Sequence, residues 1–207
     1  MAALDGVAGE GGHAESRAPA AAASRDGIVS ERSRQPSESR GMIADSIAFL
    51  IRNLPAGLLV LALVLGAAGR PRRLNRASRF LGWVLLLPIG VTGLWAGIAH
   101  VFFPHVAAAH IGWETSPFQY EVGMADFAVG VTACLAFWRT WEFRAAAVCA
   151  ASIFLLGDAV GHVRQMLAAG NFAPGNAGVP FYMDIIAPLL AIALLIGARR
   201  AETRRSM

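Results

Sequence analysis

Five apolar runs between residues 54 and 198 limit what this chain can fold into. They cover residues 54–69, 80–103, 118–138, 145–168 and 179–198. A membrane-spanning helix needs about 20 predominantly apolar residues, and the last four runs are near or above that length. Within a bilayer a helix satisfies its own backbone hydrogen bonds. We therefore expect an all-α integral membrane helical bundle of five spans.

The first run leaves an alternative open. It is about 16 residues long, and Arg52, Asn53 and Pro55 separate it from the apolar residues 43–51. Proline disturbs a helix when it lies beyond the first turn, so the first span is kinked or begins with an interfacial turn. Four spans plus an interfacial or re-entrant first segment is the alternative architecture.

The ends of the chain differ in composition from its centre. Residues 1–41 are rich in Ala, Gly, Ser, Arg and Glu and have no periodic apolar face. Such a segment cannot bury enough apolar surface to order itself, so we expect a disordered polar tail. Because Met42 follows it, a gene-model extension is an equally simple explanation. The transmembrane domain is expected over residues 42–198 and a basic cytoplasmic tail over residues 199–207.

The basic residues predict the orientation. All 18 are arginine. From residue 70 onwards they cluster in residues 70–79, at Arg139 and Arg144, and after residue 198, apart from Arg164 in the fourth run, whereas the loops 104–117 and 169–178 contain none. Because basic loops stay on the cytoplasmic side, the Arg-rich loops and the C-terminus are expected inside, in a bacterial inner membrane. The arginines flank apolar runs and form no basic face with stacking aromatics, which argues against nucleic acid as a partner.

A polar stretch inside the fourth run carries the candidate site. Asp158, His162 and Gln165 follow at i, i+4 and i+7 and share one face of a helix. An ionisable side chain near the middle of a membrane is a functional-site hypothesis by default, because it is costly to keep there unpaired.

Three further ionisable residues, His100, Asp126 and Asp184, fall in the predicted outer halves of their runs. Small-residue stripes indicate which helix faces approach one another closely. These stripes are Gly90, Gly93 and Gly97 leading to His100, Gly123 and Gly130 around Asp126, and Gly157 and Gly161 beside Asp158 and His162. Glu121, Asn171 and Asn176 are expected at the outer mouth, where the turn-rich loop 169–178 fits either a lid or a plain connector.

Three functions fit this pattern. The first is the binding or transport of a proton, a cation or a small polar ligand at Asp158 and His162. The second is a membrane-embedded redox enzyme that uses a quinone or a metal held by His100, Asp158 and His162, which are suitable ligand types. The third is a structural or assembly subunit in which Asp158 and His162 neutralise each other. Because no HExxH motif or placed nucleophile is present, the sequence leans away from an enzyme. The expected partners are the lipid bilayer and either further copies of the chain or a membrane complex.

Two strings carry a resemblance. They are Trp113-x-x-Ser116-Pro-Phe-Gln119-x-Glu121-x-Gly123 and Asn171-x-x-Pro174-Gly-Asn176-x-Gly178. Together with Gly157, His162 and Tyr182-x-Asp184, they resemble an uncharacterised family of small bacterial multi-pass inner-membrane proteins over about residues 80–198. The resemblance implies a membrane location and brings no activity. In layout the chain is also similar to DoxX-like membrane proteins.

Overall fold

The computed structural model describes residues 42, 45–46, 49–69 and 75–206. The chain divides into two units, Met1–Ala44 and Asp45–Met207, and the description below concerns the second. The predicted polar tail 1–41 and the arginines at positions 70, 72 and 73 lie outside the described residues. Over the described ranges every regular element is a helix, which confirms the all-α prediction.

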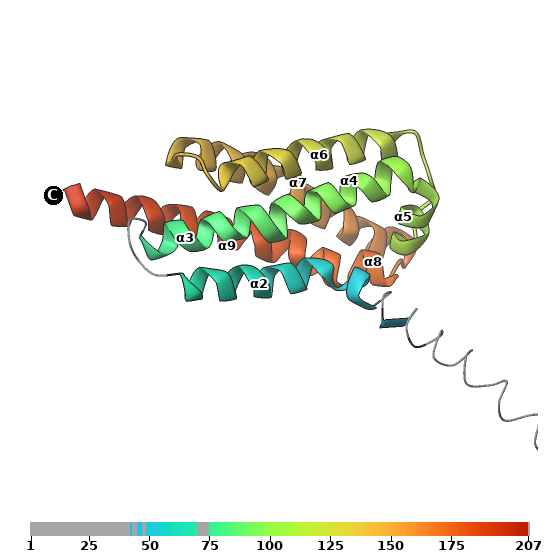
Figure 1. Cartoon of the computed structure of the whole chain (residues 1–207). Helices are drawn as coiled ribbons and strands as arrows, with labels where there is room; N and C mark the ends of the chain where they lie inside the picture. Colours follow the sequence, from blue (N-terminus) through green and yellow to red (C-terminus); the bar gives the residue numbers. More distant parts are fainter. Residues whose placement is uncertain (1–41, 43–44, 47–48, 70–74, 207) are drawn as a thin grey trace, which may run out of the picture. The chain divides into compact units, whose positions relative to one another are not determined.

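The helices form a bundle with two short helices at one end (Figure 1). In chain order they are α2 (Leu54–Ala68), α3 (Arg76–Val84), the π-helix η1 (Leu85–Val91), α4 (Thr92–Phe102), α5 (Pro104–Ile111), α6 (Phe118–Ala136), α7 (Trp141–Ala169), α8 (Pro174–Ala177) and α9 (Val179–Ser206). The closest neighbours are α4 with α6, α7 with α9, and α3 with both α2 and α9. Short α5 and α8 contact each other at the end of the bundle opposite the C-terminus.

Local sequence signals set several helix boundaries. At the start of α3 the Asn75 side chain accepts a hydrogen bond from the Ser78 N–H (2.8 Å) and donates one to the Ala198 carbonyl (3.1 Å). This caps α3 and ties it to α9. Gly112 and Gly170 end α5 and α7 with φ values of 70° and 61°, a conformation in which glycine has no Cβ to strain. The basic C-terminal segment continues α9 as far as Ser206.

Three helical stretches are long and apolar enough to cross a membrane. They are Arg76–Phe102, Trp141–Ala169 and Pro174–Arg204. Helix α2 is also apolar but has only 15 residues, fewer than the about 20 that a span needs. Helix α6 has 19 residues and carries Gln119, Glu121 and Asp126 in its first half. The membrane-compatible character of the chain is therefore confirmed at three helices, and the count of five spans stays a prediction.

The first long stretch contains an unpredicted π-helix. Residues Leu85–Val91 adopt this wider coil between α3 and α4, with Pro88 inside it. A proline cannot donate the backbone hydrogen bond that an α-helix requires. A π-turn changes the local hydrogen-bond pairing, and this accommodates the missing donor. Pro88 and Ile89 face the internal cavity described below, so the irregular turn helps to shape it.

Glycine stripes pack α4 against α6 as expected. A Cβ on Gly93 would lie 3.1 Å from Gly130 Cα, and one on Gly97 would lie 3.0 Å from the Gly123 carbonyl oxygen. The prediction is wrong for the pair on α7. A Cβ on Gly157 would meet nothing within 4 Å, because this residue borders the cavity and not a neighbouring helix.

A buried arginine joins three helices near the start of α7. Arg144 is 6% exposed. Its Nε donates to the Ala136 carbonyl (3.0 Å), and its Nη2 donates to the Phe137 carbonyl (2.7 Å) at the end of α6. Its Nη1 donates to both the carbonyl and the hydroxyl oxygen of Ser78 (2.9 Å each) on α3. Arg144 therefore holds the end of α6 and the start of α7 against α3, a role that its place beside a predicted loop did not reveal.

Candidate functional site

A cavity of about 320 Å³ lies among α4, α6, α7 and α9, and residues of α5, α8 and the segment 51–55 also line it. Five ionisable residues named from the sequence line it: His100, Asp126, Asp158, His162 and Asp184. They come from four different helices, so the fold brings together side chains that lie up to 84 positions apart in the sequence.

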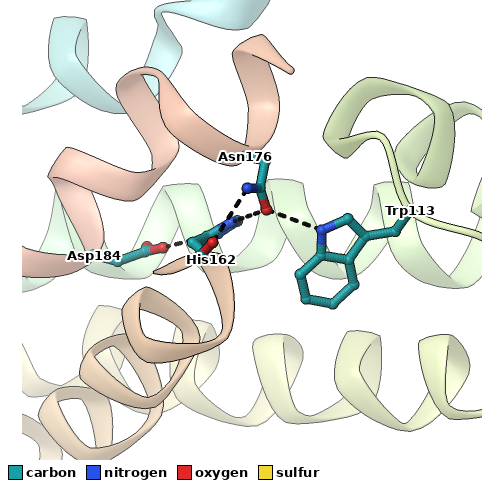
Figure 2. Close-up of polar contacts among 4 residues, drawn as sticks. All are labelled: Trp113, His162, Asn176 and Asp184. Atoms are coloured by element: carbon teal, nitrogen blue, oxygen red, sulfur yellow. Dashed lines mark hydrogen bonds and ion pairs between the residues drawn. The ribbon is translucent and has the colours of Figure 1, made fainter. Parts of the chain in front are cut away.

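Asn176 is the centre of the hydrogen bonds at one wall of this cavity (Figure 2). It is fully buried. Its Oδ1 accepts from the Trp113 Nε1–H (2.9 Å) and lies 2.8 Å from His162 Nδ1. Its Nδ2 donates to the carbonyls of Asn171 (2.9 Å) and His162 (3.3 Å). Every polar atom of the amide therefore has a partner, and the amide joins α8 to α7 and to Trp113 in the segment after α5.

These contacts fix which nitrogen of His162 carries a proton. The indole N–H of Trp113 can only donate, so the Asn176 atom facing it must be the oxygen. The same oxygen faces His162 Nδ1 and can only accept, so Nδ1 carries a hydrogen. Protonation and deprotonation of the ring are therefore left to Nε2.

His162 Nε2 faces a carboxylate. It lies 3.4 Å from Asp184 Oδ2, and both side chains are largely buried. Because Nδ1 keeps its hydrogen, Nε2 is the ring atom that can exchange a proton with Asp184. The partner that the sequence suggested, Asp158 one turn earlier on the same helix, lines the cavity and does not form this ion pair. A carboxylate on α9 takes that place, and sequence spacing within α7 could not identify it.

Asp126 is the most isolated polar group of the cavity. Its side chain is 7% exposed and makes no hydrogen bond with any described residue. The charges nearest to it are those of Asp158 and Asp184, which have the same sign. Two more atoms among the cavity-lining residues, Thr92 Oγ1 and His100 Nδ1, are buried without a partner within the described part of the chain. Buried polar groups normally find partners, so this wall of the cavity is chemically incomplete.

Four other predicted site residues lie elsewhere. Glu121 is exposed on α6, away from the cavity. Gln165 shares the helix face of Asp158 but lies about 10 Å further along the axis, beyond the cavity, where its carbonyl accepts from Gly170 and Asn171. The Asn171 side chain donates to the carbonyls of Ile111 (2.9 Å) and Gly112 (3.1 Å), so it ties the loop before α8 to α5. Asn176, expected at the mouth, is buried as described above.

The sequence did not identify three residues that border the cavity. Trp113 received no role in the predicted site, but its indole N–H donates to Asn176 beside the cavity. Arg52 and His110 also line the cavity. Burial, and then the nearby Arg52 charge, lower the pKa of His110 below its ordinary value, so His110 is neutral at neutral pH. The Asn-rich turn after α7 was a usable signal for Asn176, whereas nothing local pointed to Trp113.

The lining combines this polar wall with a larger apolar surface. Apolar side chains line the remainder: Pro88, Ile89, Trp95, Val122, Val129, Phe154, Leu155 and Met183. Among the described residues, no three His, Cys, Asp or Glu side chains are grouped so that they could hold a metal ion. The predicted set of His100, Asp158 and His162 therefore lines one cavity without forming a metal-ligand cluster.

Comparison with known proteins gives one match. Residues 49–204 match the model of a family of unknown function, DUF6790. Searches of curated proteins and of solved structures found no match. The matched range includes the helices from α2 to α9, apart from the last two residues of α9, and every residue that lines the cavity.

Proposed function

Since the chain belongs to the DUF6790 family, whose function is unknown, we propose a function from its own residues. The protein is a five-span inner-membrane protein whose cavity binds a small cation or polar ligand from the outer side, in exchange for protons. The observation that carries this proposal is the convergence of His100, Asp126, Asp158, His162 and Asp184 on one cavity.

The positions of the arginines support the orientation. Arg79 donates to the Gly66 carbonyl (2.7 Å), and the Arg199 guanidinium lies 4.8 Å from the ring centre of Trp141. Helix α3, which carries Arg79, and the last turns of α9, which carry Arg199, lie at the end of the bundle where the C-terminus is found (Figure 1). The cavity lies towards the other end, near α5 and α8. If the Arg-rich end is cytoplasmic, as the positive-inside rule requires, the cavity opens towards the outer face.

The carboxyl groups support proton exchange. Asp126, Asp158 and Asp184 share one cavity with a single paired imidazole, that of His162. Carboxylates that lie close together in a low dielectric cannot all be ionised without compensating positive charge. They therefore titrate as a coupled group, and a cation that enters can replace protons that the group holds.

Chemical labelling tests both the access and the charge of this cavity. In a background where Cys134 and Cys149 are alanine, we expect Ala96→Cys in the cavity wall to react from the outside of intact cells with membrane-impermeant thiol reagents. A cationic methanethiosulfonate should react at least about tenfold faster than an anionic one of similar size, because the carboxylates attract it. The measurement is the rate of labelling at each reagent concentration.

Ala128→Cys is the matched control. This residue lies on the exposed side of α6, two positions from Asp126. If α6 spans the membrane, the residue faces lipid, and neither charged reagent should reach it. Labelling of Ala96→Cys only from the cytoplasmic side would reverse the orientation. No labelling from either side, or equal rates for the two reagents, would contradict an accessible acidic site.

A further inference from the structure

The composition of the cavity indicates which ligand it takes. We infer that the ligand is an organic ammonium ion with an apolar body, whose charged end lies between Asp126 and Asp158. This inference rests on the proposed function above and specifies the chemical class of the ligand.

Charge in the cavity is unbalanced towards the negative. Asp184 has a partner in His162, whose Nε2 lies 3.4 Å away. Asp126 has no cationic side chain paired with it among the described residues, and Asp158 shares the charge of the same His162 from beyond ion-pair distance. Arg52 also lines the cavity, but it is exposed and acts on His110, not on Asp126. When Asp126 releases its proton, the cavity therefore supplies no positive charge of its own beside it.

Asp126 gives the independent sign that something binds there. The residue is 7% exposed, lines the cavity and makes no hydrogen bond with any described residue. A carboxyl at this position has to take its hydrogen-bond donor from the contents of the cavity, and a ligand can supply it. An ammonium group has N–H donors for this carboxylate, and it also suits the unpartnered acceptors at Thr92 Oγ1 and His100 Nδ1.

The apolar wall argues for an organic cation. A hard metal cation such as Ca²⁺ takes about six to eight oxygen ligands or keeps its water, and either arrangement leaves the apolar lining unused. The lining includes Trp95, Phe154, Leu155 and Met183. The aliphatic or aromatic part of an organic cation would cover these side chains. The indole face of Trp95 would also attract the charged group of the ligand. A volume of about 320 Å³ is at the small end of cavities that bind organic molecules.

Three probes of similar size and different charge test the inference. They are 2-phenylethylammonium, 2-phenylethanol and 3-phenylpropionate, which share a ring and a short chain. Calorimetric titration uses the full-length protein in lipid nanodiscs at neutral pH, and empty nanodiscs measure partition into lipid. We expect the ammonium probe to bind with a Kd at least about tenfold below that of the alcohol, a difference of about 1.4 kcal/mol. The carboxylate probe should bind more weakly than either.

Variants locate the preference within the cavity. Asp126→Asn and Asp158→Asn should each raise the Kd of the ammonium probe about tenfold and leave the Kd of the alcohol unchanged. Glu121→Gln, an exposed carboxylate on the same helix as Asp126, should leave both values unchanged. Two variants are used so that a folding defect in one does not decide the outcome.

Each other outcome overturns the inference in a defined way. Equal Kd values for the ammonium probe and the alcohol would mean that the cavity recognises only the apolar body. Tightest binding of the carboxylate would assign recognition to Arg52 and the histidines. If no probe binds although Ala96→Cys is labelled from outside, the ligand class is wrong and the outward-facing site stands. If that cysteine is not labelled either, both proposals fail.

Discussion

The two ends of α7 lie beside buried polar groups that differ in whether their hydrogen bonds are made. Arg144 near its start donates four hydrogen bonds, to the oxygens of Ala136, Phe137 and Ser78. Eighteen residues later, about 27 Å along the helix, His162 faces a cavity where Asp126 of α6 makes no hydrogen bond with any described residue. His162 has partners on both ring nitrogens, so the contrast lies between Arg144 and Asp126.

This difference separates a structural role from a binding role. A buried charge whose hydrogen bonds are all made locks the helices around it. A buried polar group that lacks a partner destabilises the fold, and proteins keep such groups mainly where they serve a function. Of the four buried side-chain atoms without a partner in the described chain, Thr92 Oγ1 and His100 Nδ1 belong to cavity residues, and the other two are Arg79 Nη1 and Ser152 Oγ.

The strongest test of the comparison is Arg144→Ala. Removal of the guanidinium takes four hydrogen bonds away from buried oxygens, although the Ala136 carbonyl keeps the Arg139 N–H (3.2 Å), so we expect the free energy of unfolding to fall by about 3–5 kcal/mol. Reversible unfolding in mixed detergent micelles, followed by circular dichroism, measures the change. Ammonium-probe binding in the fraction that remains folded should be unchanged, because the cavity lies towards the other end of the helix.

Arg139→Ala is the matched control at this end. Arg139 is exposed, and its guanidinium lies 5.9 Å from the Phe143 ring centre. Its loss should cost less than about 1 kcal/mol. If the two arginine variants lost equal stability, burial and hydrogen bonding would not be what gives Arg144 its role.

Asn176→Ala tests the satisfied part of the cavity wall. The variant removes the acceptor of Trp113 and His162 and the donor to two carbonyls. We expect a loss of about 2–3 kcal/mol in the free energy of unfolding, measured in the same micelles. His162 should also lose its fixed tautomer, which nitrogen-15 NMR of the labelled imidazole detects as a proton shared between Nδ1 and Nε2.

Phe172→Ala is the control in the same loop, because Phe172 is 71% exposed. It should change neither the stability nor the imidazole spectrum. If Asn176→Ala kept the proton on Nδ1, another group would have to hold the ring, and the derivation of the titrating nitrogen would be wrong.

The helices were readable from the sequence because each apolar run encodes its own element. Five runs became α2, the stretch from α3 to α4, α6, α7 and α9. The glycines that pack α4 on α6 were also readable, since small residues at helical spacing indicate close approach. The π-helix could not be predicted. A proline in an apolar run predicts an interruption of the α-helical hydrogen bonds, but it does not predict which local conformation results.

The sequence indicated which ionisable residues line the cavity, but it did not indicate which side chains contact one another. Costly ionisable residues inside apolar runs singled out Asp126, Asp158, His162 and Asp184, and all four line the cavity. Their partners follow from tertiary structure. Trp113 and Asn176 are 63 positions apart in the sequence, and Arg144 and Ser78 are 66 apart. No local sequence pattern relates residues at such distances. The sequence therefore could not distinguish the buried, fully hydrogen-bonded Arg144 from an exposed arginine in a loop.

Asp126→Asn has the smallest expected effect on stability. Unlike the variants above, it is not expected to lower the free energy of unfolding. The amide has the shape of the carboxyl group without its charge, and no hydrogen bond to a described residue is lost. Without ligand we expect the free energy of unfolding to stay the same or to rise by about 1 kcal/mol, because a buried unpaired charge is removed. The measurement repeats the micelle unfolding series beside Glu121→Gln, which should change nothing. If Asp126→Asn instead lost more than about 1 kcal/mol, Asp126 would be a structural group whose partner lies outside the described residues. The cavity end would then resemble the Arg144 end, and the unpaired carboxyl would no longer support a ligand site.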